Sequence, residues 1–210
     1  PKTGKNFAKL VGGAVDKVEL VTADGGWNWT NGLLQEQDAT KLILAQITTA
    51  LRIQAVGGNF VCKVYETFTE TSLKIIALLR SVYNTVYVFK PLMSRDSNPE
   101  KYIVCLDFKL KNPDAVVNKL DKMMAEIFKH KELNVINIFS NIKIDDSLTY
   151  PVVHMNTKIA NNQYISMNEI IDYIEKDNFY GDEYKQRRQQ QIDSTTFWLE
   201  RFGTKDAKNK

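Results

Sequence analysis

The first half of the sequence alternates short β-branched segments with longer segments of helical periodicity. Strands are expected over residues 18–23, 59–64, 85–90 and 101–109, and helices over residues 37–55 and 70–83. This alternation favours an α/β fold with a mainly parallel sheet and helices on both faces. A polar loop instead of a helix joins the last two strands, which predicts an antiparallel pair at the sheet edge.

Glycine, threonine and proline mark the predicted boundaries. Gly57 and Gly58 are expected to end the first helix as a C-cap pair, and Thr69 to cap the second. After Asn112-Pro113 the strand pattern stops. Further helices are expected over residues 113–131, 167–176 and 184–201. We therefore divide the chain into a sheet-forming part, residues 1–110, and a mainly helical extension, residues 111–210.

Composition excludes several classes of protein. The 28 basic and 25 acidic side chains give a net charge of +3, which is not that of a polycation. The apolar runs are a few residues long, whereas a membrane-spanning helix needs about 20, so no membrane partner is expected. Cys62 and Cys105 lie in apolar strands and are expected to be buried thiols. No His, Cys or carboxylate cluster has metal-ligand spacing.

Three stretches of the chain resemble a known family. They are VTADGGWNW at 21–29, GGNFVCKVYETFTETS at 57–72 and FKPLMSRDSNPEKYIVC at 89–105. In this order they resemble the C-terminal half of the FtsJ-type 2′-O-ribose methyltransferase domain, as in the eukaryotic and large-DNA-virus enzymes that methylate capped mRNA. Residues 188–203 resemble the C-terminal helix of those enzymes. The resemblance implies a Rossmann-like sheet, S-adenosylmethionine as cofactor and capped RNA as partner.

The resemblance also implies a catalytic set. Family members use a Lys-Asp-Lys-Glu tetrad, of which Asp24, Lys63 and Glu100 match the last three members. Lys63 would be the general base for the ribose 2′-hydroxyl, with Asp24 and Glu100 orienting it. A lysine has an ordinary pKa of about 10.4, so burial and a second cation are expected to lower that of Lys63. All three residues lie at strand ends, where open α/β sheets bind ligands.

Further matches concern the RNA. The residues that the resemblance places against RNA are Ser94, Arg95 and Asn98 in one loop, and Trp27, Trp29 and Asn31 in another. Arginine suits a phosphate, and tryptophan can stack on a base. Half-buried packing is the alternative interpretation of the two tryptophans.

The chain departs from the family pattern upstream of the ADGG strand. The first tetrad lysine and the glycine-rich cofactor loop are not found, so the cofactor-binding residues stay unassigned, with Asp24 and Gly25 as the candidates. We therefore expect the N-terminal half of the domain as a partner, on another chain or segment.

Two other functions stay open. A degenerate, non-enzymatic subunit that binds RNA or protein would explain the absent cofactor loop. A methyltransferase for ribosomal or transfer RNA would share the fold. Rich use of Asn, Ile and Lys is compatible with a virus, so a cytoplasmic site, in a viral factory or a virion, is expected, with a nuclear site left open.

Overall fold

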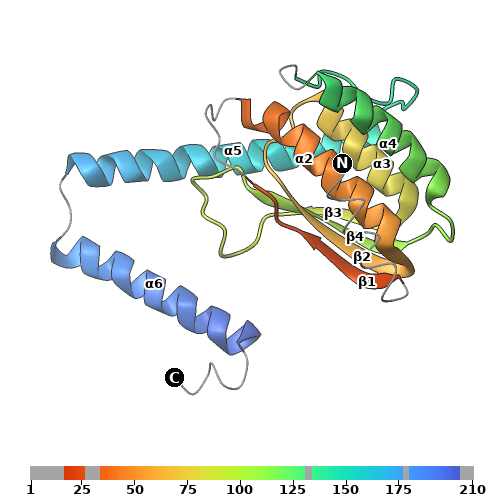
Figure 1. Cartoon of the computed structure of the whole chain (residues 1–210). Coiled ribbons are helices and arrows are strands. Elements are labelled where there is room, and N and C mark those ends of the chain that lie inside the picture. The colour runs from red at the N-terminus through yellow and green to blue at the C-terminus, as the bar shows by residue number, and fades with distance from the viewer. Residues whose placement is uncertain (1–16, 27–33, 131–133, 177–179, 204–210) are drawn as a thin grey trace. The chain divides into compact units, whose positions relative to one another are not determined.

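The computed structural model describes residues 17–26, 34–130, 134–176 and 180–203 (Figure 1). Its elements are β1 (Val18–Ala23), α2 (Gln35–Ile53), β2 (Gln54–Val64), α3 (Glu70–Val82), β3 (Tyr83–Phe89), β4 (Lys101–Phe108), α4 (Asp114–Lys129), α5 (Asp146–Glu175) and α6 (Gly181–Phe202). The chain forms two compact units, Pro1–Gln163 and Tyr164–Lys210. The described elements after β4 are all helices, so the α/β fold with a helical extension is confirmed.

The sheet has the strand order β1-β2-β4-β3. Strands β1 and β2 are parallel, and β4 runs antiparallel to both of its neighbours. The predicted antiparallel pair of β3 and β4 therefore exists. Of these two strands β3 is at the edge of the sheet, because β4 lies between β3 and β2. Val64, the last residue of β2, is paired with Lys101, the first of β4. This register brings the loop before β4 to the carboxyl end of β2.

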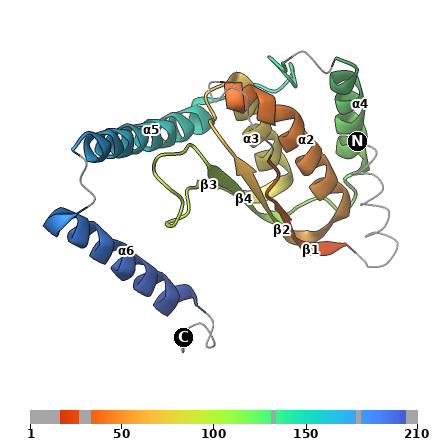
Figure 2. The ribbon, with the colours of Figure 1, turned by 60° about the vertical axis from the view of Figure 1, so that its left-hand side comes forward.

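One face of the sheet is buried under helices. Helices α2 and α3 lie over this face (Figures 1 and 2), and Phe60, Cys62 and Cys105 are fully buried in the core that includes apolar side chains of both helices. Alternation along each strand sends Lys63 and Tyr102 to the opposite face, where both are half-buried. The helices described within residues 17–163 that contact the strands lie on the first face. The second helical layer that we predicted is thus not among the described residues.

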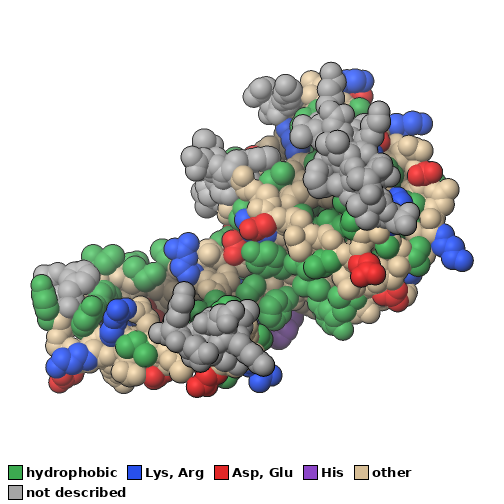
Figure 3. Space-filling model, turned by 60° about the horizontal axis from the view of Figure 1, so that its bottom comes forward, with side chains coloured by type: hydrophobic (Ala, Val, Ile, Leu, Met, Phe, Trp, Pro, Cys, Tyr) green, Lys and Arg blue, Asp and Glu red, His purple; other side chains and the backbone are tan. Residues whose placement is uncertain are grey.

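The opposite face is rich in apolar side chains. Leu20 of β1 and Tyr87 and Phe89 of β3 are 61%, 56% and 55% exposed on it. Figure 3 brings this side of the sheet forward and shows hydrophobic side chains gathered there. Monomeric proteins rarely leave a large contiguous apolar patch open to water.

The prediction for Gly57 and Gly58 is wrong. Helix α2 ends at Ile53, and both glycines lie inside β2, which starts five residues before the predicted strand. The pairing with β1 shifts register between Val18 and Leu20, so β2 bulges where it meets β1. Gly57 has a φ of +81°, and a Cβ on Gly58 would lie 2.8 Å from a carbonyl oxygen of β1. The glycines therefore serve a bulge and a close strand approach instead of a cap.

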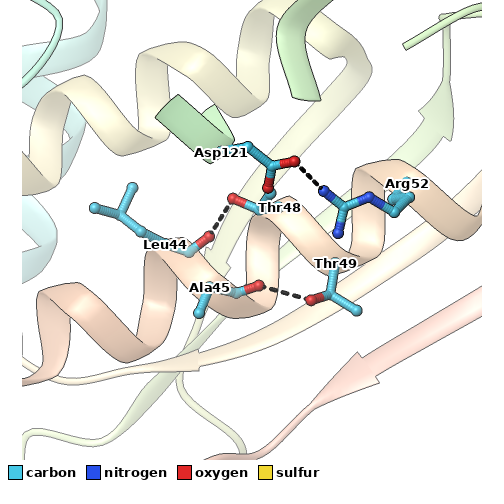
Figure 4. A network of polar contacts seen from close by, with 6 residues as sticks. All are labelled: Leu44, Ala45, Thr48, Thr49, Arg52 and Asp121. Carbon is cyan, nitrogen blue, oxygen red and sulfur yellow. Dashed lines mark hydrogen bonds and ion pairs between the residues drawn. The ribbon is translucent and has the colours of Figure 1, made fainter. Parts of the chain in front are cut away.

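Figure 4 shows two internal side-chain hydrogen bonds of helix α2 and its ion pair to helix α4. The hydroxyls of Thr48 and Thr49 donate to carbonyl oxygens one turn back, at 2.7 and 2.9 Å. One turn further on, Arg52 donates to Asp121 of α4 at 2.7 Å. Both partners are partly exposed, so this pair contributes at most about 1 kcal/mol and mainly fixes where α4 lies on α2.

Helix α5 is longer than the sequence predicts. We expected a helix only over residues 167–176, whereas α5 starts at Asp146 and includes Pro151 near its first turns. Asp145 caps it by accepting a hydrogen bond from the Leu148 amide at 3.1 Å, and Leu148 and Val152 pack into the core. Burial of this apolar stripe offsets the cost of the proline. No helix in the described part of the chain is long and apolar enough to cross a membrane.

The buried thiol of Cys62 predicts a loss of stability at high pH. Burial, helped by the charge of Asp24, raises its pKa from 9.0 to about 12. Above pH 9 the unfolded chain releases a thiol proton that the folded chain keeps, so folding weakens as the pH rises. Between pH 9 and pH 10.5 we expect wild type to lose about 1.5 kcal/mol more stability than Cys62→Ala. Urea unfolding at both pH values measures this, and parallel curves for the two proteins would contradict it.

Candidate active site

An ion pair joins the carboxyl ends of the two parallel strands. Asp24 follows directly after β1, and Lys63 is the penultimate residue of β2. Because β1 and β2 are parallel and in register up to Ala23 and Cys62, the next residues meet at one edge. The Lys63 ammonium lies 2.8 Å from an Asp24 carboxylate oxygen. The lysine side chain is 14% exposed and the aspartate 69%, so the pair sits at the surface with its lysine stem covered.

Tyr102 and Glu100 complete this edge. Tyr102 pairs with Lys63 across β2 and β4, and its hydroxyl donates to Asp24 at 3.4 Å. Glu100 precedes β4, and its charge acts on both Lys63 and Tyr102. The structure therefore gathers Asp24, Lys63 and Glu100, which the sequence places far apart, around the end of β2.

The pKa of Lys63 is raised, against our expectation. Burial alone would lower it, but the hydrogen bond to Asp24 and the negative charges of Asp24 and Glu100 reverse the effect. An ammonium held by carboxylates stays protonated at neutral pH. The surroundings given by the described residues therefore keep Lys63 protonated. The second cation that we expected to lower its pKa is not among these residues.

The turn after β1 packs closely against side chains of α2 and β2, so a Cβ at either glycine would meet them at short distance. The Gly25 amide donates to the Gln46 side chain of α2 at 3.1 Å, and a Cβ on Gly25 would press on the same group. A Cβ on Gly26 would lie 3.3 Å from the Tyr65 hydroxyl and 3.7 Å from the Lys63 ammonium. The two glycines thus keep the approach to Lys63 open.

The loop between β3 and β4 folds around a lysine. Lys90 donates to the hydroxyl of Ser94, to the backbone and side-chain oxygens of Asn98 and to the carbonyl of Glu100, at 3.0–3.2 Å. The side-chain oxygen of Asn98 also accepts the Glu100 amide at 3.2 Å. Two of the predicted RNA-binding residues, Ser94 and Asn98, are thus engaged within the loop.

The other predicted RNA-binding residues are one exposed residue of this loop and three residues outside the described part of the chain. Arg95, at the tip of the same loop, is exposed. Trp27, Trp29 and Asn31 lie outside the described residues. Arg95 is therefore at the surface, and the RNA-binding roles of all six residues stay predictions.

A buried charged cluster supports the site from below. Lys101 is 2% exposed and donates to the carbonyls of Tyr65 and Pro99, which joins β2 to the loop that carries Glu100. Burial lowers the pKa of Lys101 to about 8, partly offset by the charges of Glu66 and Glu36. Burial raises the pKa of Glu66, and its Oε2 has no hydrogen-bond partner among the described residues.

Glu36 ties the segment after β2 to helix α2. Its carboxylate accepts hydrogen bonds from the amides of Phe68 and Thr69 at 3.1 and 2.9 Å. It also accepts from the hydroxyls of Thr69 and Ser72. The Thr69 hydroxyl in turn accepts from the Ser72 amide and caps α3, as predicted.

Sequence reasoning missed several residues of this site. Those that shape it without having been singled out are Glu36, Gln46, Tyr65, Lys90, Lys101 and Tyr102. Lys90 and Tyr102 belong to the motif at 89–105. A charged residue at a strand end and a tyrosine close to Glu100 could have indicated that both belong to the site. Among the described residues no group of His, Cys, Asp and Glu could hold a metal ion.

Comparison with known proteins gives a consistent family. Residues 2–108 match the FtsJ-like methyltransferase family. The chain is 30% identical over 129 residues to the cap-specific mRNA (nucleoside-2′-O-)-methyltransferase 2 of Drosophila melanogaster, which covers 61% of this chain and 18% of that protein. The corresponding methyltransferase 1 of Danio rerio is 35% identical over 124 residues, or 58% of this chain and 15% of that protein.

The alignment with a human relative covers more of the chain. The Homo sapiens cap-specific mRNA (nucleoside-2′-O-)-methyltransferase 1 is 30% identical over 165 residues, which is 75% of this chain and 19% of that protein. The chain thus spans less than a fifth of the length of these relatives. The matched region contains all of the sheet and the cluster around Lys63. On this evidence the chain belongs to the FtsJ-like methyltransferase family.

Proposed function

We propose that this chain carries the acceptor side of an enzyme that methylates the ribose 2′-hydroxyl of capped mRNA, with S-adenosylmethionine as methyl donor. The observation that carries the proposal is the Asp24–Lys63 pair at 2.8 Å beside Tyr102 and Glu100, in a chain of the FtsJ-like family. The named relatives are cap-specific mRNA methyltransferases, which supports capped RNA as the substrate class.

Each residue has a role that its position allows. Lys63 takes the proton of the 2′-hydroxyl once its own proton has left, and Asp24 holds the lysine in place at the end of β1. Glu100 and Tyr102 bind and orient the ribose from the β4 side. When bound, S-adenosylmethionine supplies an electrophilic methyl group. We assign the turn at Asp24 and Gly25 to contact with this cofactor, and we infer that a segment outside the described residues supplies the remainder of its site.

The raised pKa of Lys63 supports the need for a second cation. Asp24 favours the charged form of Lys63, and a neutral amine is required for proton transfer. A further lysine or arginine near Asp24 would compete for the carboxylate and repel the ammonium, and both effects lower the pKa. We infer that the missing half of the domain provides it, as the first lysine of the tetrad.

The open side of the sheet supports the same partner. Among the described strands β1 is paired only with β2, which leaves its other edge free to pair with a further strand. On the face that the described helices leave uncovered, Leu20 of β1 is 61% exposed, and apolar side chains of β3 are exposed at the far edge of the sheet. A segment that adds strands to β1 and covers this face would bring the cofactor loop beside Asp24.

The mass of the purified active protein tests this partner. We expect a second polypeptide, or a single one well above 24.1 kDa, in denaturing mass spectrometry of the sample that methylates RNA. A single 24.1 kDa species with full activity would contradict the proposal of a missing half.

A substrate panel tests the class of RNA. Incorporation of labelled methyl groups is measured for capped mRNA, the same RNA without a cap, ribosomal RNA and transfer RNA. We expect incorporation into capped RNA to exceed the others by about tenfold or more. Preference for ribosomal or transfer RNA would reassign the substrate, and binding of RNA without incorporation would favour a non-enzymatic subunit.

A further inference from the structure

Lys90 holds together the loop that connects β3 to Glu100. It leaves β3 directly after Phe89, and its ammonium reaches four oxygens of the loop at 3.0–3.2 Å. An ammonium has three N–H donors, so one of them is shared between two acceptors. All four acceptors are neutral, and they come from both the middle of the loop and its end. This segment is not paired as a strand, and hydrogen bonds from the Lys90 side chain hold its backbone instead.

The backbone of the loop depends on the same centre. The Ser94 amide donates to the Pro91 carbonyl at 2.9 Å, and the Asn98 amide to the Arg95 carbonyl at 3.3 Å, which form two consecutive turns. Lys90 bonds to the side chain of Ser94 after the first turn and to Asn98 after the second. Asn98 also fixes the backbone at Glu100, because its side-chain oxygen accepts a hydrogen bond from the Glu100 amide.

Charge reinforces this arrangement. Burial lowers the pKa of Lys90, while the carboxylates of Asp96 and Glu100 act in the opposite direction. The carbonyl of Glu100 is a direct acceptor of the Lys90 ammonium, and the charge of its carboxylate also acts on Lys63. Lys90 therefore connects the loop to the active-site edge through Glu100, which belongs to both.

We propose that Lys90 is a positioning residue, which orders the loop over residues 91–99 and thereby sets Glu100 and Asn98 for the RNA substrate. This proposal rests on the proposed function for its catalytic part only. It also assigns Asn98 a divided role. The carboxamide oxygen accepts two hydrogen bonds within the chain, so only the amino group of Asn98 can be offered to an RNA acceptor.

Hydrogen exchange on the full-length protein tests the structural part without reference to activity. The variant Lys90→Met keeps the apolar stem and removes the donors, and Lys119→Met on the exposed face of α4 is the matched control. In Lys90→Met we expect the amides of Ser94, Asn98 and Glu100 to exchange about tenfold faster or more, with the β2–β4 amides unchanged. Unchanged exchange in the loop would overturn the proposal. Faster exchange throughout the sheet would also overturn it, because Lys90 would then support the whole fold.

Steady-state kinetics test the positioning part. We expect Lys90→Met to lower kcat/KM for capped RNA by about tenfold or more, through both a lower kcat and a higher KM for RNA. The KM for S-adenosylmethionine should stay within about twofold of wild type, since the loop faces the acceptor side. A loosened loop with unchanged kinetics would overturn the positioning role. A wild type that does not methylate RNA would instead refute the proposed function, while hydrogen exchange still decides whether Lys90 orders the loop.

Discussion

Replacing Lys63 with methionine is expected to lower kcat for RNA methylation by about a thousandfold while the protein stays folded. General-base catalysis contributes about 10²–10⁴ in rate, and the change removes the ammonium that lies 2.8 Å from the Asp24 carboxylate. The stem of Lys63 is largely covered, and methionine fills the same space. Loss of the ion pair costs little stability, because Asp24 is mostly exposed to solvent.

Lys63→Arg separates base catalysis from charge. Arginine keeps a cation beside Asp24 but does not lose its proton in proteins, so it restores the ion pair without the base. We expect Lys63→Arg to be nearly as inactive as Lys63→Met, and the exposed control Lys143→Met to retain wild-type kcat. Activity near wild type in either Lys63 variant would remove Lys63 as the base. Thermal unfolding of each variant checks that the fold is kept.

The second large effect concerns stability. Glu36→Ala is expected to reduce the free energy of unfolding by about 3 kcal/mol or more. Glu36 is only 7% exposed, and its carboxylate accepts from two backbone amides and two hydroxyls in the segment that follows β2. Alanine would leave the amides of Phe68 and Thr69 without this acceptor, and a buried donor without a partner is costly.

Asp38→Ala provides the matched control. Asp38 lies in the same first turn of α2 and shares the favourable charge at the helix N-terminus, but it is partly exposed. We expect this control to cost about 1 kcal/mol or less. Urea unfolding of the two variants measures the difference. Equal losses would show that the hydrogen bonds of Glu36 do not stabilise the segment after β2.

The strands were predictable because they depend on local patterns, whereas the candidate catalytic set came from the family resemblance, and its role stays a prediction. The runs at 18–23 and 101–109 match β1 and β4 within one residue, since β-branched runs bounded by polar turns are strong signals. The site at the carboxyl ends of β1 and β2 follows from parallel pairing. The placement of Glu100 could not be predicted from local patterns alone, because it depends on the antiparallel pairing of β4 with β2.

Other features depend on contacts that no local pattern contains. Gly57 and Gly58 looked like a helix end, but the approach of β1 makes them a bulge within β2. The start of α5 was missed because Pro151 opposes a helix locally, and only packing against the core offsets this. Glu36 accepts hydrogen bonds from the amides of Phe68 and Thr69, which the fold brings to it from a distant part of the chain, so these partners could not be predicted from spacing.

The most direct test of the central claim is the identity of the atom that receives the methyl group. Capped RNA is incubated with wild-type protein and S-adenosylmethionine, digested to nucleosides and analysed by mass spectrometry. The account predicts a 2′-O-methylated nucleoside next to the cap in wild type and its loss in Lys63→Met. Methylation on a base, or an equal yield of the 2′-O-methyl nucleoside from Lys63→Met, would contradict the assignment of the Asp24–Lys63–Glu100 cluster as the acceptor site.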